Sequence, residues 1–236
     1  MTDLTSDTRA GPREFALGVA HTLPLMAGAI PFGLLLGSLA AKAGLSPLEV
    51  ALMSGLIFAG GSQFLAVELW AHGAAAASIV ASVLLVNLRH LLMGATLAPR
   101  LRGLPPLRAA VTMFLMTDEV WALAMQRGAA LTLPYWFGVG LTLYTVWLAS
   151  TVGGTFAGAL IDDPVAWGLD FTFTALFLCL LVGFWRNVRT TLAPWLASAA
   201  VAVAVHALMP DGAWHILLGA LSGGAVAAWR GRLRHA

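Results

Sequence analysis

Long apolar blocks are the feature that most limits what this chain can fold into. Hydrophobic residues fill 59% of the 236 positions and charged residues only 10%, against about 25% charged residues in an ordinary soluble domain. A bilayer core about 30 Å thick needs about 20 apolar residues for one helical crossing. Because lipid offers the backbone no hydrogen-bond partner, such blocks must be helices, which satisfy their own backbone groups. The sequence therefore predicts an all-α, polytopic integral membrane protein.

The apolar sequence divides into eight blocks. They are 15–41, 48–72, 75–98, 109–126, 134–160, 164–185, 192–209 and 212–229. Gly- and Pro-rich turns or charged residues separate the blocks, and the connections are too short to hold a soluble domain. We therefore expect seven or eight transmembrane or re-entrant helices, some of them interrupted. Residues 15–236 should form one transmembrane domain behind a polar N-terminal tail, residues 1–14.

The basic residues give a conflicting signal on orientation. Lys and Arg gather on the cytoplasmic side of membrane proteins. If every block crosses, eight basic residues share the side of both termini and four share the other side. Three of those four, Arg100, Arg102 and Arg108, belong to the single loop 99–108, which contradicts the rule. One block, either 134–160 or part of the first three, is therefore expected to be re-entrant or broken, and seven spans is the alternative.

Two stretches in the first two apolar blocks contain prolines or glycines that can interrupt a helix. Pro24 and Pro31 lie in the first block, and each proline removes a backbone donor. The second block contains Gly60-Gly61-Ser62-Gln63. Interrupted helices are tolerated at membrane depth only where they are buried or line a cavity, and in transporters half-helix ends bind charged groups of substrates. We predict breaks near Gly28–Pro31 and Gly60–Ser62 that face each other across one cavity. Close helix packing is the alternative role for these residues.

Ionisable residues inside apolar blocks form the third group of candidates. Asp118 and Glu119 lie in the middle of block 109–126, and Asn87-Leu88-Arg89-His90 lies in block 75–98. A charge at the bilayer centre costs about 2.5–3.5 kcal/mol even on insertion scales, so it persists where it is paired or faces water. We predict that Arg89 pairs with Asp118 or Glu119 and that the other carboxylate meets a solute or a proton. A static ion pair that joins two helices is the alternative.

The remaining polar and aromatic residues carry weaker signals. Asp170 near the start of its block is either a site residue or a carboxylate at a helix N-terminus. His21 and His206 are expected to be packing residues. Tryptophans such as Trp136 and Trp147 are expected to be interfacial anchors. The sequence has no P-loop, no metal-binding cluster and no hydrolase nucleophile motif, so no cofactor is expected.

Several short motifs occur in order along residues 14–190. They are Ile30-Pro31-Phe32-Gly33, Ala43-Gly44-Leu45-Ser46-Pro47, Phe58-Ala59-Gly60-Gly61-Ser62-Gln63-Phe64, Asn87-Leu88-Arg89-His90-Leu91, Thr117-Asp118-Glu119 and Gly168-Leu169-Asp170-Phe171. In these motifs the chain resembles the AzlC family, the large subunit of branched-chain amino acid permeases and exporters. The resemblance implies proton-linked export of valine, leucine, isoleucine and sometimes methionine across the bacterial cytoplasmic (inner) membrane. It also implies a small AzlD-type (YgaH-like) membrane subunit as partner.

The combined expectation is a secondary transporter subunit rather than an enzyme. Its substrate is an amino acid, it is surrounded by a lipid bilayer, and it has no nucleic-acid partner. The expected substrate-binding or coupling residues are Pro31, Gly60, Gly61, Ser62, Gln63, Asn87, Arg89, His90, Asp118, Glu119 and Asp170. Three alternatives stay open: an exporter of another small solute on the same scaffold, an integral-membrane enzyme that uses Asp118, Glu119 and His90 as acid–base groups, and a non-transporting assembly subunit.

Overall fold

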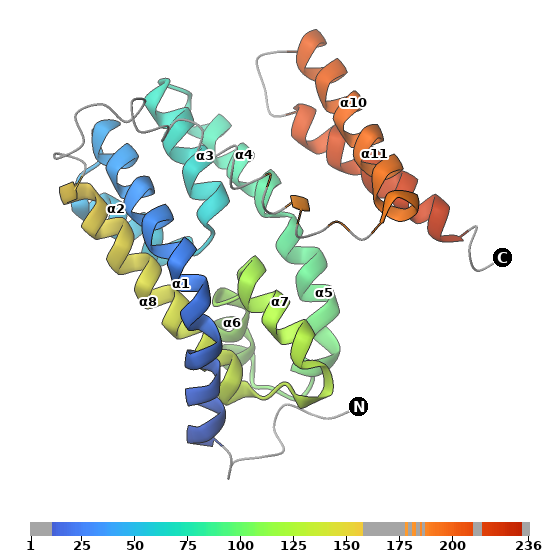
Figure 1. Cartoon of the computed structure of the whole chain (residues 1–236). Helices are drawn as coiled ribbons and strands as arrows, with labels where there is room; N and C mark the ends of the chain where they lie inside the picture. Colours follow the sequence, from blue (N-terminus) through green and yellow to red (C-terminus); the bar gives the residue numbers. More distant parts are fainter. Residues whose placement is uncertain are drawn as a thin grey trace. The chain divides into compact units, whose positions relative to one another are not determined.

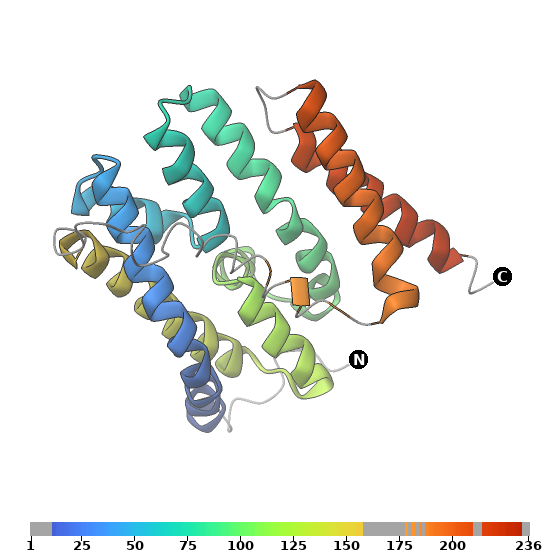
Figure 2. The same cartoon turned by 45° about the horizontal axis from the view of Figure 1, so that its top comes forward.

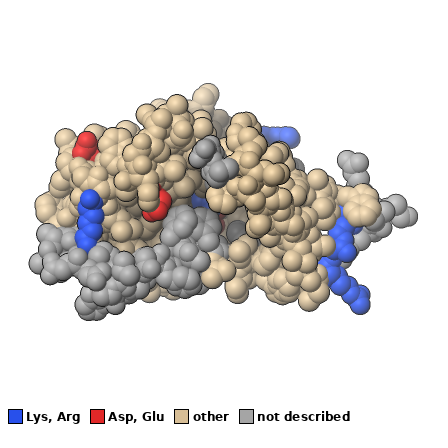
Figure 3. Space-filling view, turned by 90° about the horizontal axis from the view of Figure 1, so that it is seen from above, with Lys and Arg blue, Asp and Glu red and all other residues tan. Residues whose placement is uncertain are grey.

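The structure of the chain is a helical membrane fold. The computed structural model describes residues 11–157, 178, 181–182, 185, 187–209 and 214–232. Every regular element in these ranges is a helix, which confirms the predicted all-α class. Four of the described helices are long and apolar enough to cross a membrane, namely Gly11–Lys42, Ala76–Leu101, Leu133–Ala157 and Val188–Leu208. The space-filling view in Figure 3 shows few, scattered charged residues among the uncharged ones on the face seen from above.

The described residues group into two compact units, seen in Figure 1. Unit 1 contains α1 (Gly11–Lys42), α2 (Pro47–Leu56), α3 (Gly60–Ala71), α5 (Arg89–Leu101), α6 (Pro106–Phe114), α7 (Asp118–Arg127), η1 (Gly128–Ala130) and α8 (Leu133–Ala157). Unit 2 contains most of α4 (Ala76–Asn87), the π-helical turn η4 (Val188–Leu192), α10 (Ala193–Leu208) and α11 (Trp214–Arg232). Helix α1 begins at Gly11, within the predicted polar tail. The organisation of residues 15–236 as a single domain stays a prediction.

Helices α1 and α8 lie side by side and form the frame of unit 1 (Figures 1 and 2). Glycines set their separation, because a Cβ atom on Gly18 would collide with the carbonyl oxygen of Tyr135, and one on Gly37 would collide with that of Thr151. Small residues let membrane helices approach closely and gain van der Waals contact. Higher residue numbers in α1 meet higher numbers in α8, so the two helices run in the same direction.

Helix α1 is continuous through both of its prolines. The helix extends over 32 residues with Pro24 and Pro31 inside it, so the predicted break near Gly28–Pro31 is wrong. Both proline side chains are exposed, and a Cβ atom on Gly28 would meet no other atom. Each proline removes one backbone hydrogen bond, while the rest of the helix is held along its length by α8. The prolines therefore do not interrupt the helix.

Two of the predicted blocks are instead hairpins of half-length helices. In block 48–72, α2 has 10 residues and α3 has 12, separated by Ile57–Ala59, which we call the first break. In block 109–126, α6 has 9 residues and α7 has 10, separated by Leu115–Thr117, which we call the second break. At about 1.5 Å per residue none of these helices reaches the roughly 30 Å of a bilayer core. Of the two candidates that the charge pattern suggested, block 134–160 contains the continuous helix α8, whereas a break does occur within the first three blocks, in block 48–72.

The two hairpins enter unit 1 from opposite ends. The first hairpin starts at Pro47, shortly after the C-terminal end of α1 at Lys42. The second hairpin ends at Arg127, whose guanidinium pairs with Glu14 in the first turn of α1. Figures 1 and 2 show the same arrangement, with α6 and α7 near the start of α1 and α2 and α3 toward its far end.

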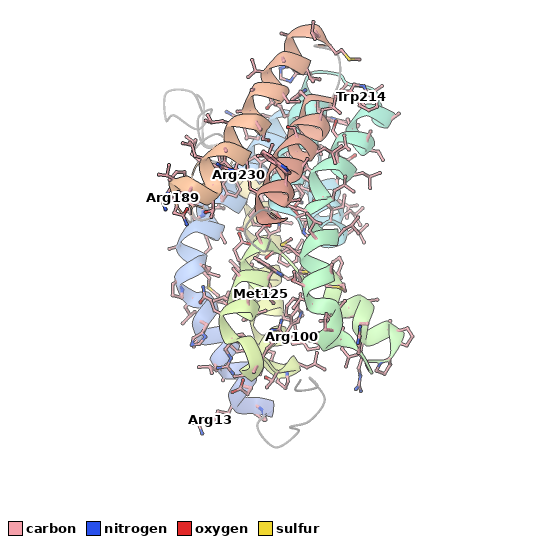
Figure 4. All side chains as sticks on the ribbon, turned by 90° about the vertical axis from the view of Figure 1, so that its right-hand side faces the viewer. Arg13, Arg100, Met125, Arg189, Trp214 and Arg230 are labelled. Atoms are coloured by element: carbon pink, nitrogen blue, oxygen red, sulfur yellow. The ribbon has the colours of Figure 1, made fainter. Side chains whose placement is uncertain are left out.

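This arrangement removes the conflict in the basic residues. Arg100 donates to the sulfur of Met125 at 3.9 Å, which places the end of α5 beside the end of α7. Figure 4 shows Arg100 next to Met125 and toward the same end of unit 1 as Arg13. Because block 109–126 returns to the side from which it enters, loop 99–108 shares that side with the start of α1. The arginines of the loop then satisfy the positive-inside rule together with Arg13 and Arg127.

In unit 2, α10 and α11 pack as an antiparallel pair. A Cβ atom on Gly219 would lie 3.0 Å from Ala202, whereas one on Gly223 would lie 3.0 Å from the carbonyl oxygen of Pro194. The Arg230 guanidinium donates to the carbonyl oxygen of Arg189 at 3.2 Å, and Figure 4 shows these two residues together.

The hairpin arrangement predicts the sidedness of the loops. In a chain whose Cys179 is replaced by alanine, single cysteines at Arg13 and Arg102 should react with a membrane-impermeant maleimide from the same side of sealed vesicles. A cysteine at Lys42 should react from the other side, because α1 crosses between Arg13 and Lys42. Labelling of the Arg102 cysteine from the side of Lys42 would contradict the re-entrant second hairpin.

The α1–α8 contact predicts a position-dependent effect of adding a methyl group to a glycine. Gly37→Ala should lower the midpoint of thermal unfolding in detergent, because the new methyl forces the two backbones apart at a cost of about 1–3 kcal/mol. Gly28→Ala is the matched control in the same helix, where the methyl meets no atom and alanine stabilises a helix by about 0.5–1 kcal/mol. Equal unfolding temperatures for the two variants would show that the close approach is unimportant.

Candidate functional site

The two breaks meet at one residue of α8, Tyr144. The ring of Phe58 at the first break contacts the Tyr144 ring edge-on with centroids 5.2 Å apart, and Phe114 at the end of α6 does so at 5.7 Å. Two helix interruptions therefore come together, but they are not the predicted pair. The first break, which directly precedes the predicted Gly60–Ser62, meets the second break before Asp118 and not the Gly28–Pro31 stretch of α1.

Side chains of α8 donate hydrogen bonds to both hairpins. The Tyr144 hydroxyl donates to the carbonyl oxygen of Gly55 at 2.9 Å, and the Trp136 indole donates to that of Thr112 at 3.0 Å. These carbonyls belong to the last turns of α2 and α6, where a helix leaves acceptors without an internal partner. Trp136 and Trp147 are 2% and 6% exposed. The prediction that these two tryptophans are interfacial anchors is therefore wrong.

The first turn of α3 is held by Ser62 and Gln63, which are almost completely buried. The Gln63 amide nitrogen donates to the Ser54 hydroxyl at 2.9 Å, and its amide oxygen accepts from the Trp147 indole at 2.9 Å. The Ser62 hydroxyl donates to the carbonyl oxygen of Ala59 at 2.9 Å. Neighbouring protein groups thus bind both ends of the Gln63 amide, so Gln63 holds the first break together.

Asn87 and Arg89 connect the two half-helix starts. The Asn87 amide nitrogen donates to the Ser62 hydroxyl at 3.1 Å, in the first turn of α3. Arg89 Nη1 lies 3.0 Å from Asp118 Oδ2, in the first turn of α7, with side-chain exposures of 29% and 16%. The predicted pairing of Arg89 with one of the two mid-block carboxylates is therefore confirmed. Glu119, the other carboxylate, is half-buried and has no ion pair with any residue that the structure describes.

Helix α7 starts on a side-chain cap and runs parallel to α5. The Thr117 hydroxyl accepts from the Val120 amide, which caps the helix at the second break. Farther along, the Trp121 indole donates to the Thr96 hydroxyl at 2.8 Å. Because later residues of α5 meet later residues of α7, the ion pair to Asp118 is one of several contacts that fix the register of these helices.

Most of the predicted site residues lie in this region of unit 1. Those at the two half-helix starts and in the segment between them are Gly60, Gly61, Ser62, Gln63, Asn87, Arg89, His90, Asp118 and Glu119. His90 Nδ1 is 3.2 Å from the carbonyl oxygen of Asn87. Pro31 is exposed on α1 and is not part of the group, and Asp170 lies outside the described residues. Whether these residues bind a ligand stays a prediction.

Sequence reasoning missed the residues that join the hairpins, above all Tyr144. Its signal was present, because a tyrosine in the middle of an apolar block must find a partner for its hydroxyl. The second break also had a signal, since a Thr followed by two acidic residues is typical of a helix start. Within the described ranges, no three His, Cys, Asp or Glu side chains form a group that could hold a metal ion.

The Arg89–Asp118 pair predicts a non-additive effect of substitution. Arg89→Gln should lower stability by about 3 kcal/mol, because it leaves the Asp118 carboxylate poorly solvated and unpaired. The double variant Arg89→Gln/Asp118→Asn should recover most of this loss, because it removes both charges. Thermal unfolding of the two single variants and the double variant gives the coupling energy. Additive losses would mean that the ion pair contributes nothing.

Comparison with known proteins matches the chain to one family. The profile of the AzlC protein family matches residues 24–161. An "Uncharacterized membrane protein" of Archaeoglobus fulgidus is 32% identical over 221 residues, covering 92% of this chain and 95% of that protein. "Inner membrane protein YgaZ" of Escherichia coli is 29% identical over 236 residues, covering 96% of each. "Branched-chain amino acid transport protein AzlC" of Bacillus subtilis is 27% identical, covering 74% of this chain and 69% of that protein. No solved structure shows a significant match.

Proposed function

The chain belongs to the AzlC protein family, and on this basis we propose that it is the large subunit of a secondary transporter that exports valine, leucine and isoleucine, and also methionine. The name of the Bacillus subtilis relative supports a transport role rather than an enzymatic one. The family match covers both hairpins and the whole of the Arg89–Asp118 region. The proposed function therefore concerns the part of the chain in which the candidate site lies.

The observation that carries the proposal is the placement of charges at a helix interruption. Arg89 and Asp118 pair at the start of the half-helix α7, and Glu119 stands beside them without a described ionic partner. In secondary transporters, discontinuous helices and oppositely oriented elements surround the substrate and ion sites near the middle of the membrane. The two hairpins of this chain are likewise discontinuous and oppositely oriented, since they enter from opposite ends and meet at Tyr144.

Glu119 is the group we propose to couple export to protons. An ionised carboxylate attracts a substrate ammonium group, and a protonated one does not. Proton uptake and substrate binding at Glu119 then exclude each other, and each favours a different conformation of the hairpins. Export of substrate and import of a proton follow from this competition.

The aromatic rings between the breaks fit an apolar substrate side chain. Phe58 and Phe114 each contact the Tyr144 ring, and they lie at the breaks that precede α3 and α7. Apolar surfaces discriminate weakly, by about 1–3 kcal/mol per methylene, so several branched side chains should share the site.

The surroundings of the chain are also part of the proposal. We place it in the cytoplasmic (inner) membrane of a bacterium, with the arginine-rich end of unit 1 facing the cytoplasm. Leu91 and Leu92 on α5 are 69% and 74% exposed. Such side chains suit contact with lipid or with a small AzlD-type membrane subunit, which we propose as the partner.

Proton coupling is tested by comparing leucine transport driven by a pH gradient with leucine exchange at equal pH. In proteoliposomes that contain the chain with its small subunit, Glu119→Gln should lower leucine transport driven by a pH gradient by about tenfold or more, because the side chain no longer titrates. Exchange of labelled for unlabelled leucine at equal pH should persist but need a higher leucine concentration, because exchange requires no proton movement while the glutamine no longer attracts the ammonium group. Asp118→Asn should impair both, since it also removes the partner of Arg89.

Glu68→Gln is the matched control, the same change at an exposed residue of α3, and should transport normally. If Glu119→Gln retains full gradient-driven transport across pH, the carboxylate is structural and the coupling proposal is wrong. If the natural chain shows neither gradient-driven transport nor exchange of leucine, the proposed function itself is ruled out.

A further inference from the structure

Two buried polar atoms in the candidate site have no hydrogen-bond partner among the described residues. They are Oδ1 of Asn87, which is an acceptor, and Nε of Arg89, which is a donor. Buried polar atoms in proteins are nearly always hydrogen-bonded, so each exception needs a specific explanation. The two atoms have opposite hydrogen-bonding character and belong to residues separated only by Leu88.

The orientation of the Asn87 amide is fixed by its neighbour. The Ser62 hydroxyl uses its single proton on the carbonyl oxygen of Ala59, so its oxygen must accept from Asn87. Only the amide nitrogen of Asn87 can donate to it. The amide oxygen therefore occupies the other side of the group, where it is buried and unpaired.

The Arg89 guanidinium has N–H donors that its ion pair with Asp118 does not use. Asp118 is bound through Nη1, and a guanidinium has five N–H donors arranged in a planar fork. The Nε donor is left for a second acceptor, and a carboxylate is the group that the fork matches best. The third buried atom of this kind, Nε of Arg127, belongs to a guanidinium that binds Glu14 and lies over the Tyr135 ring. That group is at the end of α7 and not at a break.

The charges of the region limit which ligand can satisfy both atoms. One guanidinium and two carboxylates leave an excess negative charge when Glu119 is ionised. A plain carboxylate would pair with Nε, but it would meet this negative charge and leave Oδ1 of Asn87 unpaired. A plain amine would suit Oδ1 and Glu119 and leave Nε unpaired. A ligand that carries both a cationic donor and an anionic acceptor offers a partner to each atom.

We propose that Asn87 and Arg89 together bind the two charged groups of a zwitterionic α-amino acid. Asn87 Oδ1 accepts from the α-ammonium group, and Arg89 Nε donates to the α-carboxylate. This inference rests on the proposed transport function and specifies the chemistry that its site recognises. It also gives the two half-helix starts a common ligand, since Asn87 is bonded to Ser62 in α3 and Arg89 to Asp118 in α7.

The test uses three probes that share one side chain. L-Leucine carries both charges, 4-methylpentanoate carries only the carboxylate, and 3-methylbutylamine carries only the amine. Binding to the purified chain with its small subunit is measured by calorimetry. The natural chain should bind leucine at least about tenfold more tightly than either analogue, since each analogue leaves one buried atom unpaired.

The variants should change this preference and not only the affinity. Asn87→Leu should reduce the advantage of leucine over 4-methylpentanoate, because only Glu119 then attracts the ammonium group, and Asn87→Asp, which keeps an acceptor, should preserve the advantage. Arg89→Lys keeps the charge but loses the fork, and should remove the advantage of leucine over 3-methylbutylamine. Arg100→Lys on the same helix is the control and should leave all three affinities unchanged.

The inference is overturned if either analogue binds the natural chain as tightly as leucine, or if the variants weaken all three probes equally. Leucine transport by the same preparation separates the two ideas. If the natural chain transports leucine but the variants do not change the preference for leucine over its analogues, this inference is wrong and the proposed function is unaffected. A natural chain that neither binds nor transports leucine removes both.

Discussion

Unit 1 depends on hydrogen-bond donors that reach backbone acceptors within an apolar environment. A helix that stops at mid-length leaves carbonyl oxygens without internal partners, and lipid cannot supply any. Helix α8 meets this need at both hairpins, through the Tyr144 hydroxyl on Gly55 and the Trp136 indole on Thr112. The close glycine contact between α1 and α8 holds α8 in place against α1. The α1–α8 pair therefore positions the half-helices and the charged groups at their starts.

The sequence predicted the class of fold and its helical blocks but not which blocks are broken. Proline was a misleading signal, because Pro24 and Pro31 lie on an exposed side of a helix that a long neighbour supports. The second break contains neither glycine nor proline, and it begins a new helix through the Thr117 cap. Charge counting detected that some block returns to its own side, yet it could not identify block 109–126. That decision required the contacts of Arg100 and Arg127.

The candidate site was predictable where burial of a charge demands a partner, as for Arg89 and Asp118. It was less predictable where a polar residue has two possible uses. Ser62 and Gln63 look like ligand-binding groups in the sequence, but the Gln63 amide is occupied at both ends by Ser54 and Trp147. Asn87 has the same amide chemistry and keeps one end unpaired. Only the geometry of neighbouring donors and acceptors separates these two cases.

The segment from Asn87 to Arg89 has a mechanical consequence. Its first residue is bonded to the start of α3 and its last to the start of α7, with Leu88 alone between them. Three residues of backbone cannot stretch beyond about 3.3–3.6 Å per residue. While both bonds hold, the two half-helix starts can therefore separate only as far as this backbone and the two side chains reach. The segment sets an upper limit on how far the hairpins can move apart at their inner ends.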